Sequence, residues 1–549
     1  MSEKTTLFIN GHILTMDEKN RIAGSVLVEN KRIIQVWDEF DPRNTINLDK
    51  DSKIIDLNKK TLLPGFIDTH NHILMYGLLR KQVDCSSPSN NSISDILSRI
   101  KAKASEMKES EWILGYGYDD TLLIDNRHPT KEDLDLVAPK NPVFITHISG
   151  HLAVANSLAL RYAGISNSTP QPDAGHFGKD EQDKLNGVLY EPGAMGPVQQ
   201  LIPEYTLEDM VAALENASQE YLSQGITTNT DAAVTNIQQL EAHLIAAKTR
   251  KNPMRTQLMI MHNLLRKNEI YGDYSPSQLN LEIQQRSGSL AKLDSAKMFQ
   301  DGSIQGLTGA LREPYHQESH TYGELIHKQG DFQEEVLDLH QRGFRITTHG
   351  NGDRAIGSIL DAYGYALEKV PKSGHNHRIE HVQTATTEDI QRMKEMNVAG
   401  SFFINHVYYW GDRHEKIFLG PKRARRISPL AEAKDHELLF TLHSDCPVTP
   451  ISPLFSVWAA VNRKTREGKI LGPEQRIDVI TALKAMTIYG AKLIFDEENT
   501  GSIEVGKKAD FVVLDKDPLI IDPQYIKDIQ VESTFIDGEI VYNKEESVR

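Results

Sequence analysis

The sequence predicts an α/β fold built on a (β/α)8 (TIM) barrel, and three observations indicate it. Eight short apolar segments are spread along the middle of the chain. Amphipathic helical patterns separate most of them, which is typical of parallel strands joined by helices. Several segments end in a polar residue, and catalytic side chains lie at the carboxyl ends of barrel strands. The expected strands are 64–71, 224–231, 255–262, 295–301, 343–349, 377–382, 397–404 and 438–445.

Both ends of the chain are rich in short strand patterns that the middle lacks. Apolar and polar residues alternate through residues 5–17 and 25–37 and again through 529–543, with turn residues between them. We therefore expect one discontinuous domain assembled from residues 1–61 and 493–549. The barrel is expected to occupy residues 62–492 between these two parts.

The first two expected strands are much farther apart than a strand-to-helix connection requires. Residues from about 75 to 220 are therefore expected to form an insertion, with strands near 111–120 and 141–150. The insertion leaves the barrel directly after the first strand, at the carboxyl face, so we expect it to cap the barrel mouth. The alternative is a decoration on the outside of the barrel that mediates formation of a homodimer.

Composition excludes several classes of protein. The 76 acidic residues exceed the 61 basic ones, and a net charge of −15 disfavours a nucleic-acid partner or an anionic membrane surface. Two cysteines do not make a disulfide framework, and no apolar run approaches the roughly 18 residues of a membrane span. Because the N-terminus lacks the features of a secretion signal, we expect a cytoplasmic protein.

The first expected strand ends in Asp68-Thr69-His70-Asn71-His72. Side chains alternate along a strand, so His70 and His72 lie on one face. Two neutral imidazoles at the mouth of a barrel can bind a divalent cation. The alternative is a pair of structural histidines beside a loop.

Three further strands end in residues that bind metals. His349, His381 and Asp445 close the fifth, sixth and eighth expected strands. Any one of them alone could simply cap the barrel, but four such strand ends together favour a site. His443 is expected one layer below Asp445, in a structural role.

Lys297 is an unusual residue for the fourth strand, because its neighbours are apolar. A protonated amine cannot bind a metal. After reaction with CO₂ it becomes a carbamate, an anionic ligand able to bridge two ions roughly 3.5–4 Å apart. The alternative is an unmodified lysine paired with Asp301.

These segments together resemble the metal-dependent amidohydrolase superfamily, and in detail the YtcJ-like branch that includes N-substituted formamide deformylases. The resemblance covers essentially the whole chain. It is carried by PGFIDTHNH, SAKMFQDGS, THGNGDRA, RIEHVQ, LHSDCPV and GSIEVGKKADFVVLD. Features similar to the branch are SGHLAVANSLAL, GVLYEP, GITTNTDA and TGALREPY.

The resemblance implies a barrel with a composite β-sandwich domain made from both termini. It also implies a metal centre with one or two ions per chain and a CO₂-derived carbamate on Lys297. We expect zinc, because four imidazoles together with carboxylates suit it. His70 and His72 would bind the first ion with Asp445, carboxylated Lys297 would bridge, and His349 and His381 would bind the second. In THGNGDRA, Gly350 and Asn351 stand where the superfamily usually has an alanine after the histidine and an isoleucine before the Gly-Asp pair. The ligand assignment is unaffected, but the substrate contacts that the superfamily makes near that loop do not carry over.

The activity implied is hydrolysis of a non-peptide, amide-type C–N bond in a small molecule. Hydroxide at neutral pH would come from water activated by the metal, and Asp445 would act as general base and then acid. The expected substrate contacts are Tyr116, His147, His151, Glu191 and Arg312. Two alternatives stay open: an esterase, lactonase or deaminase with the same metal site, and a non-catalytic binding or regulatory homologue.

Overall fold

The structure is a computed structural model that describes residues 5–48, 50–87, 89–120, 122–148, 152–172 and 175–547. The chain forms two compact units. One, here called the main unit, comprises Met1–Leu74 and Leu214–Arg549, and the other, the inserted unit, comprises Met75–Ala213. Each unit is described by itself.

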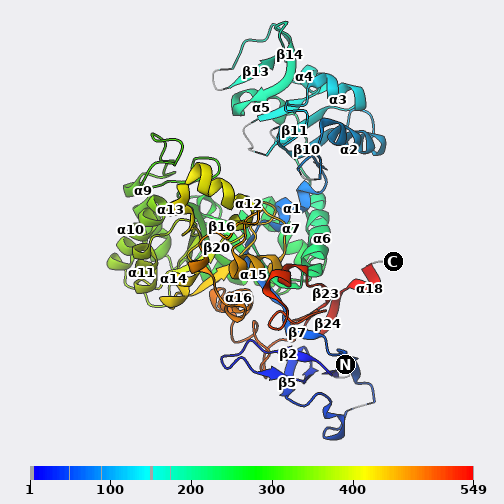
Figure 1. Ribbon diagram of the computed structural model, residues 1–549, viewed down its shortest axis with the longest axis vertical. Helices are drawn as coiled ribbons and strands as arrows, with labels where there is room; N and C mark the ends of the chain where they lie inside the picture. The colour runs from blue at the N-terminus through cyan, green and yellow to red at the C-terminus, as the bar shows by residue number, and fades with distance from the viewer. Residues whose placement is uncertain are drawn as a thin grey trace. The chain divides into compact units, whose positions relative to one another are not determined.

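The main unit contains a sheet of eight parallel strands, as the sequence predicts (Figure 1). Its order is β8-β15-β16-β17-β18-β19-β20-β21, which is also the order of the strands along the chain. The two outermost strands approach each other, because Thr69 Oγ1 on β8 lies 2.7 Å from Thr441 Oγ1 on β21. The sheet is therefore a nearly closed barrel. The strands are Phe66–Asn71, Ile226–Val234, Arg255–Met261, Ala291–Phe299, Ile346–Gly350, Arg378–His381, Ala399–Phe402 and Phe440–Leu442.

Several strand boundaries differ from the expectation by two to four residues, and one of these differences bears on the site. Strand β21 ends at Leu442, three residues before Asp445. The backbone at Asp445 has φ of 54°, a left-handed conformation that cannot continue a strand. Asp445 is therefore presented from the loop that follows the strand.

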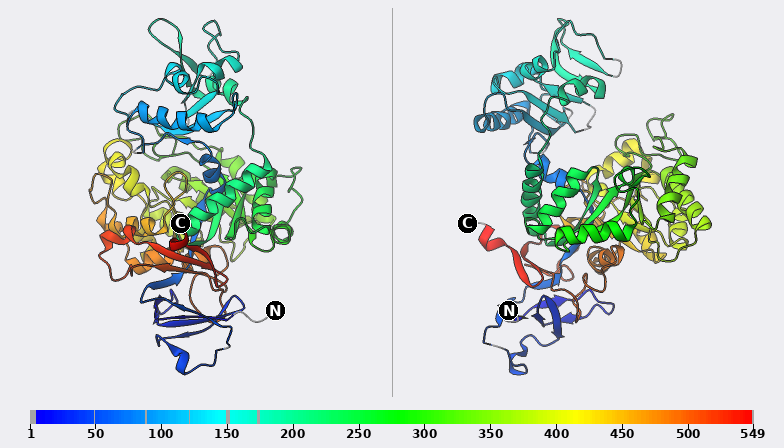
Figure 2. Two further views of the ribbon diagram at one scale, coloured as in Figure 1. Left: turned by 90° about the vertical axis from the view of Figure 1, so that its right-hand side faces the viewer. Right: turned by 180° about the vertical axis from the view of Figure 1, so that it is seen from behind.

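Helices cover the outside of the barrel strands (Figure 2). α10 (Asp353–Lys369) packs between α9 (Gln329–Gln341) and α11 (Thr387–Glu395). α10 buries apolar side chains at three- and four-residue spacing, among them Ile356, Ile359 and Tyr363, as an amphipathic helix on a sheet does. The other helices of at least six residues between β15 and residue 500 are α7 (Ile237–Lys248), α8 (Pro276–Ser287), α12 (His406–Arg413), α14 (Leu430–Asp435), α15 (Pro453–Asn462), α16 (Val479–Ala485) and α17 (Ile488–Leu493).

Two further sheets of the main unit come from the ends of the chain. The four-stranded sheet, β5-β4-β1-β6, contains Arg32–Trp37, Ser25–Glu29, Thr5–Ile9 and Lys53–Asp56. The six-stranded sheet, β24-β23-β22-β7-β2-β3, contains Glu539–Asn543, Val531–Ile536, Phe511–Leu514, Thr61–Pro64, His12–Leu14 and Ile22–Ala23. It joins both termini, because β22 pairs antiparallel with β7. Phe8 packs edge-on against Phe511 and Phe535 in a shared core.

The inserted unit has a six-stranded sheet of its own, β13-β14-β12-β11-β10-β9. The two strands expected from the sequence are β10 (Ile113–Tyr118) and β11 (Val143–His147), which pair in parallel. Its remaining strands are β9 (Val83–Asp84), β12 (Leu152–Ala155), β13 (His176–Lys179) and β14 (Leu185–Tyr190). Its helices include α2 (Ile93–Glu106), α3 (Lys131–Val137), α4 (Ser157–Tyr162) and α5 (Glu191–Gln199), and α6 (Leu207–Ser223) crosses the division between the units.

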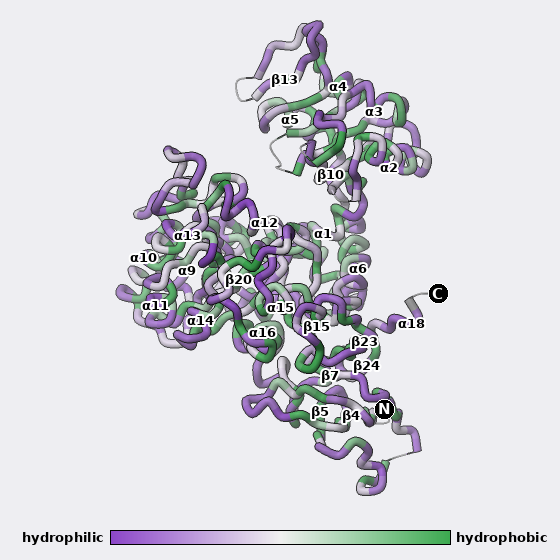
Figure 3. The backbone as a smooth tube through the Cα atoms, in the orientation of Figure 1, coloured by the Kyte–Doolittle hydropathy of each residue, from purple (hydrophilic) through white to green (hydrophobic). Residues whose placement is uncertain are grey.

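In Figure 3, hydrophobic residues (green) gather in the part of the main unit that holds the barrel strands, around the label of β20. Among the residues that the structure describes, no helix combines the length and the apolar character that crossing a lipid bilayer requires.

Candidate metal centre

The carboxyl end of β8 places two imidazoles against one carboxylate. The Nε2 atoms of His70 and His72 each lie 3.3 Å from Asp445 Oδ1. His70 is buried, and His72 follows directly after the end of the strand. Imidazole nitrogens and a carboxylate oxygen that converge in this way are a donor set suited to Zn²⁺.

His349 and His381, at the ends of β18 and β19, lie beside this group. The ring centroids of His349 and His381 are 4.4 Å apart, and those of His70 and His381 are 4.8 Å apart. His70, His381 and Asp445 each offer a ligand atom within 4.8 Å of the others. The structure thus brings the histidines and the aspartate predicted from four separate strand ends into one cluster.

Lys297, on β17, is buried beside the same cluster. Its Nζ has no hydrogen-bond partner among the described residues, and it lies 4.9 Å from the centre of the Phe299 ring, which in turn contacts His349. Burial lowers the pKa of the Lys297 amine to about 8. A buried polar group without a partner is unfavourable, which makes this amine a candidate for modification or ligation.

Asp301, which the sequence offers as an alternative partner for Lys297, has other contacts. Its carboxylate accepts hydrogen bonds from the backbone N–H groups of Ala310, Asn351 and Gly352, at 2.9, 3.0 and 2.7 Å. It also lies 3.1 Å from Nδ1 of His349. Asp301 therefore orients His349 rather than neutralising Lys297.

The backbone is unusual at two of these residues. His381 has φ of 71°, its neighbour Val382 has φ of 46°, and Asp445 has φ of 54°. Non-glycine residues adopt this region at a cost of about 1–3 kcal/mol each, and they concentrate at functional sites. The surrounding fold therefore holds these side chains in orientations that an ordinary strand would not give.

Glu380 is a site residue that the sequence analysis missed. Its Oε2 lies 2.5 Å from Nδ1 of His70, and Arg378 donates a hydrogen bond to its other oxygen. All three side chains are buried. Burial alone would raise the pKa of Glu380, but Arg378 and His70 more than offset it and hold that pKa far below its usual range.

Strand alternation explains why Glu380 was missed. Glu380 and His381 are consecutive, so they should face opposite sides of the strand. Both nevertheless contact His70, because the left-handed backbone at His381 breaks the alternation. Within RIEHVQ the sequence offers a carboxylate, but no signal that it contacts the first strand.

His443 contacts two of the ligand candidates, His70 and His381. Its Nε2 is 3.2 Å from Nδ1 of His381, its Nδ1 is 2.8 Å from Ser401 Oγ, and its ring stacks on that of His70. It is fully buried, and burial lowers its pKa well below the usual value. A neutral imidazole in this position supports the two ligand candidates above it.

The two aspartates of the site differ in acidity. Burial would raise the pKa of Asp445, but the imidazoles of His70, His72 and His381 that surround it outweigh burial, so the pKa of Asp445 is well below its usual value. Burial dominates at Asp68 and raises its pKa to about 7, although the His70 backbone N–H donates to it at 3.2 Å. Asp445 is thus the carboxylate that is fully ionised at neutral pH.

The predicted substrate contacts lie in both units. In the inserted unit, Tyr116 on β10 borders a pocket of about 450 Å³, and burial raises its pKa to about 12. His147 ends β11, 3.2 Å from Asp120, and Glu191 begins α5. His151 lies outside the described residues.

Arg312 belongs to the main unit and is 39% exposed. Its guanidinium forms a two-pronged pair with Asp389 at the start of α11, at 2.8 and 3.0 Å. That pair already uses two of the N–H donors of the guanidinium group. A role of Arg312 in substrate binding stays a prediction.

Comparison with known proteins agrees with the geometry. The model of the amidohydrolase family matches residues 53–542. The chain is 28% identical to the putative amidohydrolase YtcJ of Bacillus subtilis, over 97% of this chain and 98% of that protein. It is also 28% identical to the N-substituted formamide deformylase of Arthrobacter pascens, over 98% of both proteins.

A solved structure shares the fold. A metal-dependent hydrolase of unassigned function from Pyrococcus furiosus is 26% identical, with a TM-score of 0.74 over 94% of this chain and all of that one. The family match extends over most of the chain, including every candidate ligand from His70 to Asp445. The chain belongs to the amidohydrolase family.

Proposed function

We propose that this protein is a metal-dependent hydrolase that cleaves an amide-type C–N bond in a small, non-peptide molecule. The observation that carries the proposal is the convergence of His70 and His72 on Asp445, beside the buried amine of Lys297. Its relatives support the bond type, since one of them is an N-substituted formamide deformylase.

The donor set fits divalent metal. His70, His72 and Asp445 would hold one ion, and His349 and His381 would hold a second. Nitrogen-rich donor sets with carboxylates suit zinc among the common metals. The partnerless Nζ of Lys297 supports its role as the bridging ligand, because an unmodified amine there gains no hydrogen bond from the described residues.

Lys297 would serve as a ligand only after reaction with CO₂. The nitrogen lone pair of the neutral amine forms a bond to the carbon of CO₂, one N–H proton leaves, and the product is an N-carboxylate with one negative charge. Burial favours this reaction by lowering the pKa of the amine to about 8, so that about a tenth is neutral at pH 7.

The chemistry divides between the ion and the protein. A divalent ion held by these residues would lower the pKa of a water molecule and would polarise the substrate carbonyl. Asp445, ionised and adjacent to both His70 and His72, accepts a proton from the attacking water. It then delivers this proton to the leaving nitrogen as the C–N bond breaks.

The proposed function also involves the end segments and the inserted residues. The end segments 1–61 and 493–549 form a composite β-sandwich, and the inserted residues from about 75 to 220 supply substrate-selecting side chains. The proposed contacts are Tyr116, His147, His151, Glu191 and Arg312.

A substrate panel tests this function. Zinc-loaded protein is assayed with N-substituted formamides, N-acyl amines, esters, lactones and amino-heterocycles, with Asp445→Asn as the matched control. We expect the highest kcat/KM among the amides and formamides. Turnover of esters, lactones or amino-heterocycles alone would replace the amidase proposal with an esterase, a lactonase or a deaminase. A zinc-loaded protein that acts on none of these substrates would favour a non-catalytic homologue.

A further inference from the structure

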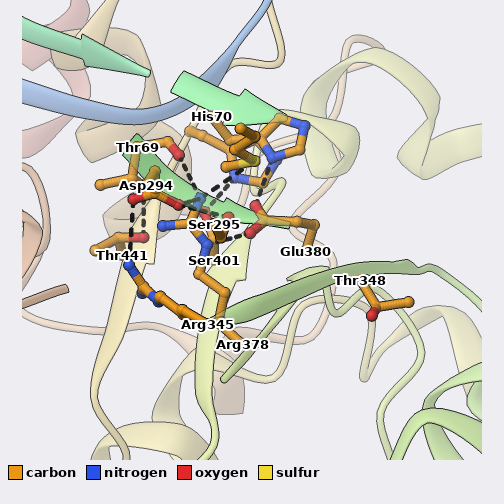
Figure 4. A network of polar contacts seen from close by, with 12 residues as sticks. Thr69, His70, Asp294, Ser295, Arg345, Thr348, Arg378, Glu380, Ser401 and Thr441 are labelled. Atoms are coloured by element: carbon orange, nitrogen blue, oxygen red, sulfur yellow. Dashed lines mark hydrogen bonds and ion pairs between the residues drawn. The ribbon is translucent and has the colours of Figure 1, made fainter. Parts of the chain in front are cut away.

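A network of buried charges lies behind His70 (Figure 4). Arg378 and Glu380 come from β19, Asp294 from β17, and Arg345 from the residue before β18. All four side chains are buried. Burying four charges is unfavourable unless opposite charges pair with one another, so each of these groups needs a partner within the network.

Glu380 determines which nitrogen of His70 carries a proton. The carboxylate has Arg378 on one oxygen and Nδ1 of His70, at 2.5 Å, on the other. An ionised carboxylate can only accept, so Nδ1 of His70 must be the donor. The lone pair of His70 is therefore on Nε2, the nitrogen that faces Asp445 at 3.3 Å.

Arg378 is itself held in place. One of its nitrogens donates to the backbone oxygen of Thr69 at 3.0 Å, directly before His70, and lies 3.7 Å from Asp294. The other oxygen of Asp294 accepts from Arg345 at 3.1 Å. The network thus contacts the strand that carries His70 through both the imidazole and the backbone.

The network is neutral in total. Two guanidinium groups balance two carboxylates, so the charge of Glu380 is compensated without any metal ion. Both oxygens of Glu380 already contact His70 and Arg378. Glu380 is therefore not one of the side chains that would bind the ion directly.

We propose that Glu380 is a positioning residue that raises the metal affinity of His70. It fixes which nitrogen of His70 is protonated and how the ring is oriented. Its negative charge also makes the lone pair of Nε2 a stronger ligand for the metal. Carboxylates that accept from the far nitrogen of a metal-bound histidine typically contribute a factor of 10–100 to metal affinity or activity. The proposal rests on the proposed function, because it assumes that His70 binds metal.

The chain offers a matched control. Glu335 is likewise held between a histidine and an arginine, since its Oε1 lies 2.5 Å from Nδ1 of His262 and accepts from Arg266 at 2.6 Å, and His262 is outside the proposed donor set. Glu335→Gln therefore makes the same chemical change without touching His70.

The test measures zinc affinity rather than turnover. The full-length chain and the variants Glu380→Gln and Glu335→Gln are stripped of metal and titrated with Zn²⁺ against a chromophoric chelator. We expect Glu380→Gln to bind one zinc ion about 10–100-fold more weakly, while Glu335→Gln binds as the wild type does. Equal affinity in Glu380→Gln and wild type would overturn the role of Glu380. A wild type that binds no zinc would instead contradict the proposed function.

A second variant covers loss of folding. Glu380→Gln leaves the buried charge of Arg378 without its partner, which can unfold the barrel. Glu380→Gln combined with Arg378→Met removes both charges at similar volume. We expect this double variant to fold, as judged by circular dichroism of the metal-free protein, and still to bind zinc about 10–100-fold more weakly. Wild-type affinity in the folded double variant would also overturn the proposal.

Discussion

The reactivity of Lys297 follows from where its amine is buried. Nζ is enclosed next to Phe299 without a hydrogen bond from the described residues, and this environment lowers its pKa to about 8. A neutral amine reacts with CO₂, whereas an ammonium does not. The same burial that disfavours a charged lysine therefore keeps part of the amine in the neutral form that reacts with CO₂.

Lys297 is predicted to carry a carbamate that depends on pH. Because its pKa is about 8, the neutral fraction falls tenfold for each pH unit below that value. Protein equilibrated with ¹³C-bicarbonate should show a carbamate signal by ¹³C NMR that weakens as the pH falls from 8 to 6. Lys297→Met serves as the control, and identical spectra from the two proteins would contradict the assignment.

The Asp445→Asn variant is predicted to lose most of its activity, although the new side chain has nearly the same size. The amide oxygen can still face His70 and His72, but it cannot accept and return a proton. Loss of general acid–base catalysis reduces kcat by about 10²–10⁴. The rate is measured on zinc-loaded protein with metal content determined in parallel, and a kcat within a few-fold of wild type would remove Asp445 from its proton-transfer role.

Among the secondary-structure elements, the loops after β17 and β18 depend on one carboxylate. Asp301 accepts from the backbone at Ala310, Asn351 and Gly352 and contacts His349. The loop after β18 lies within the segment THGNGDRA, and the hydrogen bonds that shape this loop also orient the ligand candidate His349.

Asp301→Asn is predicted to destabilise the protein and weaken the second metal position. The amide brings N–H donors toward groups that are already donors, at a cost of about 1–3 kcal/mol for each donor left unsatisfied. The melting temperature should fall clearly below that of wild type. Asp361→Asn, which removes an exposed pair with Arg392, is the control and should change it little. Equal melting temperatures for both variants would show that Asp301 is dispensable.

A chain of buried histidines joins the start of β19 to α9. Nδ1 of His377 accepts from the Ile346 backbone N–H, so its Nε2 donates to His340 Nδ1 at 2.9 Å. Nε2 of His340 donates to the Val370 oxygen. Every nitrogen is satisfied in the neutral form, and burial lowers the pKa of His377 well below its usual value.

The free energy of unfolding is therefore predicted to decrease as the pH falls, because His377 resists protonation in the folded protein. The unfolded chain gains a proton below about pH 6.5 and the folded chain does not, so stability is full above that pH and decreases below it, by about 1.4 kcal/mol per pH unit for one proton. Melting curves of wild type and His377→Asn from pH 7.5 to 5 should show a shallower slope for the variant. Parallel slopes would assign the acid sensitivity to other groups.

For the molecule as a whole, the sequence predicts the barrel but only part of the site. The eight strands follow from local periodicity and are confirmed by the eight-stranded parallel sheet. The ligand candidates follow from polar residues at strand ends, and three of them, His70, His381 and Asp445, lie close together in the structure. Glu380 and Arg378 could not be found in this way, because their roles arise from side-chain contacts with His70 and Thr69 on the distant strand β8 and from a backbone irregularity at His381. The short strands β9 and β13 of the inserted unit also lack a clear alternating pattern.

The inserted segment is predicted to select substrate. Alanine substitutions at Tyr116, His147 and His151 should each lower kcat/KM with a working substrate while zinc content stays unchanged. Measuring both quantities separates substrate binding from damage to the metal centre. If all three variants keep wild-type kinetics, the segment has no role in catalysis.

The most direct test of the central claim is the metal content of the protein together with its activity. We predict one to two divalent ions per chain by elemental analysis of the wild type, loss of hydrolysis on chelation, and recovery when Zn²⁺ is restored. The double variant His70→Ala/His72→Ala should contain less metal and show no activity. A metal-free wild type that hydrolyses its substrate at the full rate would contradict the account.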